Sequence, residues 1–213
     1  MSAVMCFQAF ESIYTRVPQL IPDKKMGRQM YLCVIHFLVF LVLSCTSVEA
    51  QQCQSSGTIN GINPPNNQCN TAYGAQCCEE GKSYNTFTCS PSVSGATNAI
   101  LTINSFEDSG DGGAPSECDE KYHSNQDPVV ALSTGWFNNM SRCNKNIIIY
   151  GNGMSVKAMV VDECDSTAGC DKDHAYQPPC DDNIVDASEA VWTALGVPSS
   201  DWGSMQISWS DDI

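Results

Sequence analysis

Residues 160–196, VVDECDSTAGCDKDHAYQPPCDDNIVDASEAVWTALG, contain the signals that decide the fold of this chain. They continue an apolar run at residues 154–161 that is typical of a β-strand. The chain then passes through an acidic loop with three cysteines and ends in a run whose apolar residues lie one helical turn apart. This order predicts a strand, a cross-linked loop and a short helix.

The start and end of that helix have recognisable signals. Asp186 occupies the expected N-cap position, and Glu189 follows three residues later. Gly196 and Pro198 end the helical run. Asp162 lies at the end of the preceding strand, so the two aspartates flank the acidic loop. They either hold the shape of the loop or take part in chemistry.

Residues 1–50 are expected to be an upstream extension followed by a secretory signal peptide. The apolar run at residues 30–43 is shorter than the roughly 20 residues of a membrane span. Arg28 precedes this run, and a small-residue cleavage site lies just before Gln51. Met26 makes an ordinary start, so the part before it is interpreted as the extension. We expect a secreted protein with no membrane association.

The chain that remains after cleavage has 163 residues, enough for one modest hydrophobic core. It keeps six basic and 21 acidic residues, a net charge of −15. Such a charge disfavours binding to nucleic acid or to an anionic membrane. We expect a monomeric protein with neither partner.

Ten cysteines remain after the leader, and an even number in a secreted chain predicts disulfides. Five precede a Pro/Ser/Gly-rich break at residues 90–95 and five follow it, so at least one bridge must cross the break. We expect a cysteine-rich segment at residues 51–90 that is cross-linked to a barrel at residues 91–213. The ten are Cys53, Cys69, Cys77, Cys78, Cys89, Cys118, Cys143, Cys164, Cys170 and Cys180.

The second half of the chain has the pattern of short β-strands. A tight turn is predicted at Tyr150-Gly151-Asn152-Gly153. Several short strands with one or two helices indicate a small barrel rather than a parallel βαβ sheet. The predicted strands are residues 99–106, 129–133, 146–150, 154–161 and an alternating run at 204–209.

A set of motifs runs through the chain after residue 130. They are STGWF at 133–137, SRC at 141–143, VVDECD at 160–165, GCD at 169–171, QPPC at 177–180, NIVD at 183–186 and AVW at 190–192. Together they resemble the kiwellin family of secreted plant proteins, also called ripening-related proteins, which implies the apoplast or cell wall as the location. The resemblance covers nearly all of residues 51–212. Ala187 is one small departure, at a position where glycine is expected.

The resemblance implies a mainly β fold, a small six-stranded double-psi β-barrel with one or two short helices, rich in disulfides. Barwin, expansins and bacterial lytic transglycosylase-like proteins share this fold. The resemblance also implies a non-enzymatic role in defence, because some members bind and inhibit enzymes that pathogens secrete, notably chorismate mutase. A secreted pathogen protein is therefore the expected partner.

A catalytic or carbohydrate-binding role is the alternative. Cleavage of a glycosidic bond needs two carboxyl groups, and Asp162 and Asp186 fall where expansin-like barrels have a polar cleft. His174 is a third candidate for that cleft. Against this, the His-Phe-Asp motif of expansins is Ile184-Val185-Asp186 here, so its histidine is missing. The partner would then be a cell-wall polysaccharide.

Partner recognition is expected on two long acidic loops, residues 107–125 and 163–183. Loops on a rigid scaffold are where binding residues usually lie. Acidic side chains on the first loop would meet a basic partner surface, and tyrosines would act as amphipathic anchors. The candidate binding residues are Asp108, Asp111, Glu117, Tyr122 and Tyr176.

Neither a cofactor nor a metal ion is expected. Cys164, Cys170, His174 and Cys180 have looser spacing than zinc sites usually show, and disulfides suit a secreted chain better. The loop acids lack the spacing of a calcium-binding EF-hand. The sequence Asn139-Met140-Ser141 is an acceptor site for N-linked glycosylation, predicted to lie in a polar turn.

Overall fold

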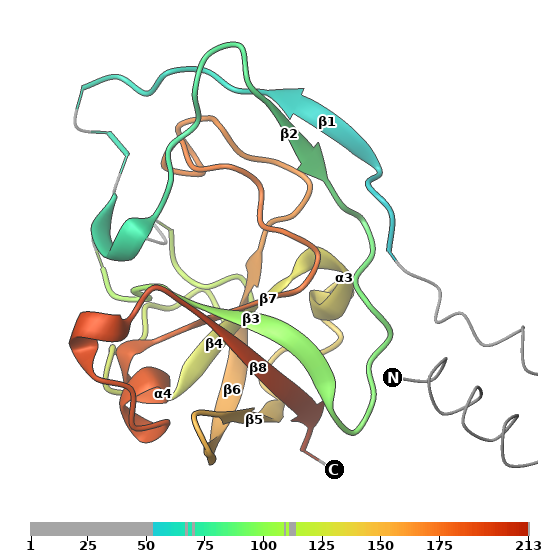
Figure 1. The fold of residues 1–213 in the computed structure, drawn as a ribbon, viewed down its shortest axis with the longest axis vertical. Coiled ribbons are helices and arrows are strands. Elements are labelled where there is room, and N and C mark those ends of the chain that lie inside the picture. Colours follow the sequence, from blue (N-terminus) through green and yellow to red (C-terminus); the bar gives the residue numbers. More distant parts are fainter. Residues whose placement is uncertain (1–52, 67, 70, 109, 111–113, 213) are drawn as a thin grey trace, which may run out of the picture. The chain divides into compact units, whose positions relative to one another are not determined.

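The computed structural model describes residues 53–66, 68, 69, 71–108, 110 and 114–212 (Figure 1). The chain divides into two compact units, Met1–Ala50 and Gln51–Ile213. The leader expected at residues 1–50 lies outside the described residues. Within the described part, no helix has both the length and the apolar character needed to cross a membrane.

Six strands close into a barrel, in the order β3-β7-β4-β6-β5-β8. The pairs β3–β7 and β4–β6 are parallel, and the other four pairs are antiparallel. The predicted six-stranded, mainly β fold is confirmed. The strands are β3 (Thr97–Ile103), β4 (Val129–Ser133), β5 (Asn146–Gly151), β6 (Met154–Cys164), β7 (Ile184–Ala187) and β8 (Ser204–Asp211).

The hairpin between β5 and β6 forms as predicted. Gly151 pairs with Met154, which leaves Asn152 and Gly153 as a two-residue turn. Both have positive φ angles, 49° and 73°, as a type I′ turn requires. Asn152 Nδ2 also donates to the carbonyl of Leu195, at 2.9 Å. The turn therefore holds the hairpin against the C-terminal end of the helix that follows β7.

Alternate residues of the strands fill the barrel interior. Val130 and Val160 belong to this buried core, together with Trp136 and Trp209, whose rings pack edge to face at 5.1 Å. The opposite faces of β4, β6 and β7 contribute to a second, smaller cluster that is covered by Phe106. These strands therefore have one face in the interior and one outer face under the loops.

The described residues contain two short α-helices, α3 (Thr134–Phe137) and α4 (Glu189–Ala194). They also contain two 3₁₀ turns, η2 (Ala72–Gly74) and η3 (Ser199–Asp201). The predicted stop of α4 is confirmed: Leu195 is its C-cap, and Gly196 follows in the left-handed region, with a φ angle of 67°.

The prediction that Asp186 is the N-cap of this helix is wrong. Asp186 lies within β7, and Ser188 occupies the N-cap position. Ser188 makes no side-chain capping bond, because its hydroxyl donates to the carbonyl of Asp127 at 2.7 Å and accepts from the amide of Val129 at 3.3 Å. Pairing of β7 with β3 and β4 extends the strand up to Ala187. Tertiary pairing has thus overridden the local helix-start signal.

The cysteine-rich segment contains a two-stranded antiparallel sheet that the sequence pattern does not predict. Its strands are β1 (Gly57–Asn60) and β2 (Ser83–Thr86). Both are four residues long and largely exposed, so they carry no periodic apolar signal. Disulfides order this part of the chain in place of a core.

All ten cysteines of the described residues are paired, which confirms the prediction of disulfides. One bridge, Cys78–Cys170, crosses the break at residues 90–95. The zinc alternative is wrong, because its three cysteines are all in disulfides. The other bridges are Cys53–Cys89, Cys69–Cys77, Cys118–Cys143 and Cys164–Cys180.

Candidate functional site

Asp162 and Asp186 lie on the two strands that flank β4, and both are register partners of the same residue. Ala131 pairs with Asp162 across the parallel β4–β6 contact and with Asp186 across the antiparallel β4–β7 contact. Two strand spacings separate the Cα atoms of the aspartates, about 10 Å. Ala131 belongs to the outer cluster, so the aspartates lie on the outer face of the barrel wall.

A β-bulge places Asp162 on this face. Val130 pairs with Val160, but the next residue, Ala131, pairs with Asp162, so Val161 is an extra residue in β6. Without it, strand alternation would turn Asp162 toward the barrel interior. A bulge that re-aims a side chain is a common feature of functional sites in sheets.

Asp162 is half-buried and holds two neighbouring backbone amides. Its Oδ1 accepts from the amides of Glu117, at 3.0 Å, and Glu163, at 2.9 Å. Burial raises its pKa, while these two hydrogen bonds and the nearby His123 oppose the rise. His123 itself contacts Asp119, with Nε2 at 3.3 Å from Oδ1, and only 12% of its side chain is exposed. His123 is therefore a histidine whose charge acts on this aspartate.

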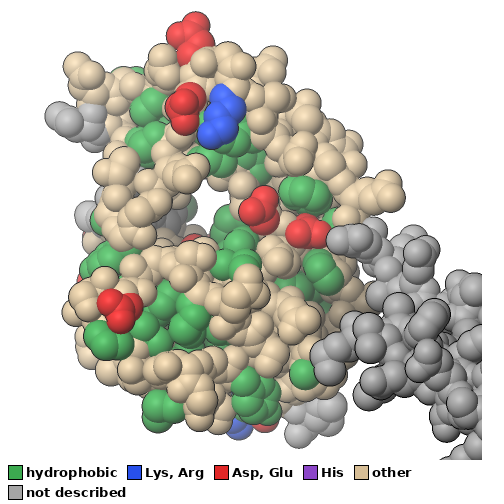
Figure 2. All heavy atoms as spheres, viewed as in Figure 1, with side chains coloured by type: hydrophobic (Ala, Val, Ile, Leu, Met, Phe, Trp, Pro, Cys, Tyr) green, Lys and Arg blue, Asp and Glu red, His purple; other side chains and the backbone are tan. Residues whose placement is uncertain are grey.

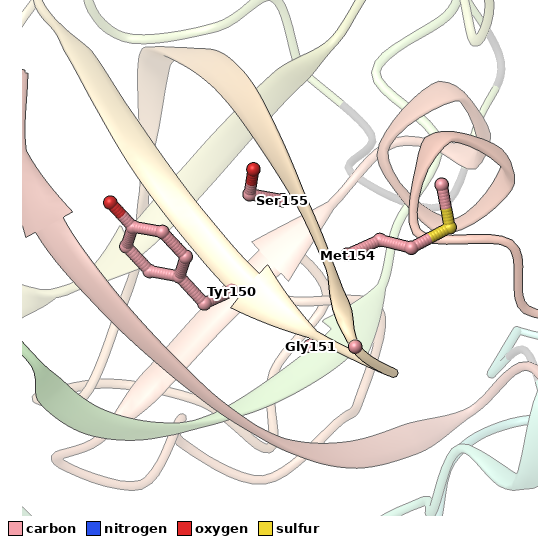
Figure 3. A pocket seen from close by; sticks show the side chains of 5 residues that line it. Tyr150, Gly151, Met154 and Ser155 are labelled. Atoms are coloured by element: carbon pink, nitrogen blue, oxygen red, sulfur yellow. The ribbon is translucent and has the colours of Figure 1, made fainter.

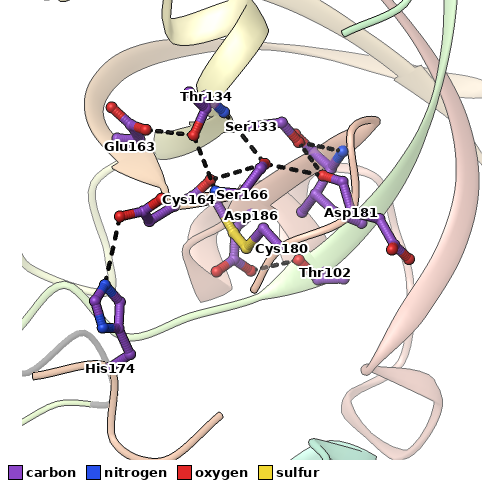
Figure 4. The surroundings of a disulfide bond; sticks show 12 residues. Thr102, Ser133, Thr134, Glu163, Cys164, Ser166, His174, Cys180, Asp181 and Asp186 are labelled. Carbon is purple, nitrogen blue, oxygen red and sulfur yellow. Dashed lines mark hydrogen bonds and ion pairs between the residues drawn. A yellow bond between two sulfur atoms is a disulfide. The ribbon is translucent and has the colours of Figure 1, made fainter. Parts of the chain in front are cut away.

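Asp186 has a bridging role between strands. Thr102 of β3 donates its hydroxyl to Asp186 Oδ1, at 2.5 Å. The two residues are register partners in the parallel β3–β7 pair, so the bond spans the outer face of adjacent strands (Figure 4). Four strands, β3, β7, β4 and β6, thus contribute to one polar strip with Ala131 in its middle.

The two acidic loops converge at the Asp162 end of this strip. The amide of Cys118 donates to the carbonyl of Val161 at 3.0 Å, which fixes the first loop beside β6. Burial raises the pKa of Glu117, and the charges of Asp162 and Asp165 raise it further. Figure 2 shows an opening between the β1–β2 part and the barrel, with acidic side chains on its border.

Glu163 belongs to the same group of carboxylates. Burial raises its pKa, the hydroxyl of Thr134 opposes the rise by donating to its carboxylate, and the charges of Asp165, Glu117 and Asp162 add to the rise. We call Glu117, Asp162, Glu163 and Asp165 the acidic group. Their mutual repulsion is a free-energy cost that a basic ligand would relieve.

The second loop is held rigidly beside this group. Ser166 is fully buried, and its amide donates to the hydroxyl of Thr134 at 2.9 Å. Ser133 donates its hydroxyl to the carbonyl of Asp181 at 2.7 Å, and the Cys164–Cys180 disulfide closes the loop (Figure 4). The loop therefore loses little conformational entropy when a partner binds.

His174 lies in the second loop, where it bridges two aspartates. Nδ1 is 2.7 Å from Asp171 Oδ1, and Nε2 is 3.4 Å from Asp165 Oδ2. Burial opposes protonation, but the hydrogen bond and charge of Asp171, with those of Asp165, raise the pKa of His174 above its ordinary value. His174 was predicted for the cleft with Asp162 and Asp186; in the structure it contacts Asp171 and Asp165, at the border of the acidic group.

The other predicted binding residues have separate surroundings. Asp108 is exposed, and Tyr122 is 41% exposed. Tyr176 is half-buried, and its carbonyl accepts the amide of Cys78, at 2.9 Å. Asp111 lies outside the described residues. Of the five, Glu117 is the one that belongs to the acidic group.

A surface hollow at the β5–β6 hairpin lies far from the aspartates. Tyr150, Gly151, Met154 and Ser155 line it, and the Tyr150 and Met154 side chains extend from the two strands (Figure 3). Asp162 is at the other end of β6, about 26 Å along the strand at 3.3 Å per residue. Across the described part of the chain, no group of three or more His, Cys, Asp or Glu residues is arranged to hold a metal ion.

These features define a class: disulfide-rich six-stranded barrels that carry an acidic, loop-covered strip on their outer face. The family model described as Kiwellin-1 matches residues 40–212. The chain belongs to the kiwellin family. Its five disulfides are typical of proteins from an oxidising, extracellular compartment.

Several relatives support this assignment. The chain is 49% identical to ripening-related protein 3 of Oryza sativa subsp. japonica over 77% of each chain. It is 60% identical to kiwellin of Actinidia chinensis var. chinensis over 61% of each chain. Among solved structures, an expansin of Clavibacter michiganensis matches with a TM-score of 0.42 and 19% identity, over 55% of this chain and 50% of the other. A likeness of that size supports no inference about function.

Proposed function

We propose that this protein is a secreted plant defence protein that binds and inhibits an enzyme released by a pathogen, and that it has no catalytic activity of its own. By family resemblance the target is a chorismate mutase. It acts in the apoplast or cell wall as a monomer, without a cofactor. Membership of the kiwellin family supports the general role.

One observation carries the proposal: two acidic loops meet on one rigid face. The acidic group combines Glu117 from the first loop with Asp165 from the second, and Asp162 and Glu163 of β6 connect them. Like charges held together on a disulfide-closed frame attract a basic surface and need no reorganisation to meet it. A basic patch beside the active site of a secreted enzyme would be the complementary surface.

The first test is charge reversal on the first loop. Asp108, Asp111 and Glu117 are changed together to lysine, and the association rate is measured with a partner captured from infected extracellular fluid. We expect slower association for the variant, and for the wild type as salt rises from about 0.05 to 0.5 M, because screening weakens steering. The melting temperature should stay nearly unchanged.

A matched control separates the loop from the overall charge. Glu79, Glu80 and Asp201 are exposed acids outside both loops. Their reversal changes the net charge by the same amount and should slow association much less. An equal loss in the two variants, or a rate independent of salt, would contradict docking on this face. Inhibition of chorismate mutase activity by the wild type tests the identity of the target.

A wall-active carbohydrate protein is the second candidate. The observation in its favour is that Asp162 and Asp186 share Ala131 as register partner on one outer face. Incubation with chitin and cellulose tests it: retention on the polymer or release of sugar would favour this candidate. We expect neither, and Asp162→Asn should then change no rate on any wall polymer. Sugar release by the wild type that stops in Asp162→Asn would establish the enzyme.

A further inference from the structure

The acceptor sequence Asn139-Met140-Ser141 lies on a sharply turned and exposed segment. Asn138, Asn139 and Met140 have consecutive positive φ angles of 52°, 51° and 63°. All three are exposed, and so is Ser141. The amide of Asn138 donates to Thr134 and closes α3, and the amide of Ser141 donates to the carbonyl of Asn138 at 3.1 Å. The side chain of Asn139 therefore projects from a fixed turn.

The neighbours of Asn139 are engaged, whereas its own carboxamide is not. In the part of the chain that the structure describes, no hydrogen bond involves the Asn139 side chain. Met140 beside it is 45% exposed. The turn is fixed on its far side by the Cys118–Cys143 disulfide. A substituent on the exposed Asn139 side chain would thus displace no hydrogen bond of the described residues, which favours a tolerated bulky modification.

A polar hollow of about 470 Å³ begins beside this turn. Its lining consists of Asn138, Ser141, Arg142, Lys145, Asn146, Asp211 and Asp212. These groups supply both donors and acceptors, which is what the hydroxyl and acetamido groups of a sugar require. The hollow and the acceptor sequence are independent observations, and they adjoin each other.

The floor of the hollow is preorganised. Arg142 donates Nε and Nη2 to the two carboxylate oxygens of Asp211, at 3.0 and 3.3 Å. Its Nη1 donates to the carbonyl of Trp136 at 2.6 Å, and the guanidinium lies 5.5 Å from the centre of the Trp209 ring. Lys157 pairs with Asp212 at 2.6 Å. Arg142, Asp211 and Asp212 are therefore held in place before any sugar arrives.

We infer that Asn139 carries an N-linked oligosaccharide and that its first sugar residues lie in this polar hollow. In the transfer step, Asn139 Nδ2 attacks the anomeric carbon of a lipid-diphosphate-linked oligosaccharide. The N-glycosidic bond forms, the bond from that carbon to the diphosphate breaks, the lipid diphosphate leaves, and Nδ2 releases one proton. The hydroxyl of Ser141 is required for the acceptor to be recognised.

The attachment is tested by secretory expression of the full chain in plant cells and intact-mass measurement of the secreted protein. We expect an excess mass equal to an oligosaccharide, which a peptide N-glycosidase removes, leaving a mapped aspartate at position 139. Asn139→Gln and Ser141→Ala should lack the excess mass. Asn138→Gln and Ser141→Thr, which preserve the acceptor sequence, should keep it. A secreted wild-type protein without the excess mass would overturn the inference.

The position of the sugar is tested by amine labelling of the glycosylated protein before and after enzymatic removal of the glycan. Labelling of Lys145 should become several-fold faster when the glycan is removed. Lys121, whose side chain is 73% exposed, is the control and should react at the same rate in both forms. Equal labelling of Lys145 in the two forms would place the sugar outside the hollow.

Discussion

Opposing electrostatic effects act on the carboxylate of Asp162, and their balance determines how a substitution changes the stability of the protein. Its two backbone hydrogen bonds and the charge of His123 favour the ionised form, whereas burial and the charge of Asp119 favour the protonated form. The pKa of Asp162 is raised, so burial prevails. The side chain therefore stabilises the position of the first loop through its hydrogen bonds and costs free energy through its charge.

Asp162→Asn should make the protein more stable at neutral pH. The asparagine Oδ1 still accepts both amides, and the buried charge is gone. In the wild type the buried charge of Asp162 lowers the free energy of unfolding at neutral pH, because the pKa in the folded state lies above the ordinary 3.8. This loss of stability disappears as pH falls through the raised pKa toward 3.8, where the carboxyl group is protonated. Urea unfolding of both proteins across the acid range measures this. An Asp162→Asn protein that is less stable than the wild type at neutral pH would contradict the conclusion that burial outweighs the hydrogen bonds.

Asp162→Ala is the companion variant. It removes the acceptor of the Glu117 and Glu163 amides as well as the charge. We expect a loss of about 1–3 kcal/mol, because two hydrogen bonds to a carboxylate are lost and the partly buried Glu163 amide is left without this partner. The same unfolding experiment compares it with Asp162→Asn.

Asp186 should stabilise the protein through Thr102 and not through a helix cap. Asp186→Ala and Thr102→Val should each lower the free energy of unfolding by about 1 kcal/mol. Because the two side chains share one hydrogen bond, the double variant should lose less than the sum of the two. A double-mutant cycle by chemical denaturation measures the coupling. Additive losses would show that Asp186 stabilises the protein through contacts other than the Thr102 hydroxyl.

At the scale of elements, strands with a local pattern could be predicted and strands made by pairing could not. The alternation in β8 and the Asn152-Gly153 turn are signals within the sequence, and both predictions are confirmed. β7 is four residues long and begins directly after a polar loop. Its strand conformation comes from pairing with β3 and β4, which are distant in sequence. Local propensity carries no information about such partners.

The residues of the candidate site also fall into a group that could be predicted from the sequence and a group that could not. Asp162 and Asp186 could be selected because paired carboxylates beside a cross-linked loop are a local feature. Thr102 and His123 could not, because long-range pairing and the first loop bring them to the strip. The bulge at Val161, which decides the side on which Asp162 lies, is invisible without the register of β4.

The second loop should be stabilised by protonation of His174. Its folded-state pKa is raised above 6.5, so the stabilisation is full below that pH and is lost as pH rises through the raised value. His174→Gln should abolish this dependence between about pH 5 and about pH 8. Imidazole titration by NMR, with unfolding measured at both ends of the range, checks it. A wild-type titration midpoint below 6.5 would contradict the bridged geometry.

The disulfide that joins the cysteine-rich segment to the second loop should contribute more stability than the small bridge next to it. Cys78–Cys170 spans 92 residues and Cys69–Cys77 spans 8. Chain entropy gives the longer bridge an advantage of about 2 kcal/mol. Paired replacement of each bridge by serines, followed by denaturant unfolding, compares them. Equal losses in the free energy of unfolding would show that the chain entropy of the denatured state does not determine how much each bridge contributes.

At the scale of the whole molecule, covalent links and charge act together. The chain after the expected leader has a net charge of −15, and self-repulsion of that size favours expansion. Five disulfides restrict the expanded states and so counter the repulsion. A small, strongly acidic protein can thereby remain folded while its charge is available for recognition.

The secreted protein should begin at Gln51 and contain no free thiol. Intact mass under non-reducing conditions after removal of any glycan, together with thiol labelling, measures both. Reduction should lower stability strongly, since native bridges in small secreted domains typically contribute about 2–5 kcal/mol each. A mature N-terminus upstream of Met30, or two or more labelled cysteines, would contradict secretion through the leader.

The order of strands around the barrel has a consequence for how the chain folds as it is made. β3 is the first barrel strand to be synthesised, and six of its residues pair with β8, the last. β8 also pairs with β5, so it closes the ring from both sides. While the ribosome still holds β8, β3 and β5 each present an unpaired edge, which is the part of a nascent sheet most prone to aggregation. Formation of this barrel therefore waits for its final strand, and protection of those two edges during synthesis falls to the chaperones of the compartment into which the chain emerges.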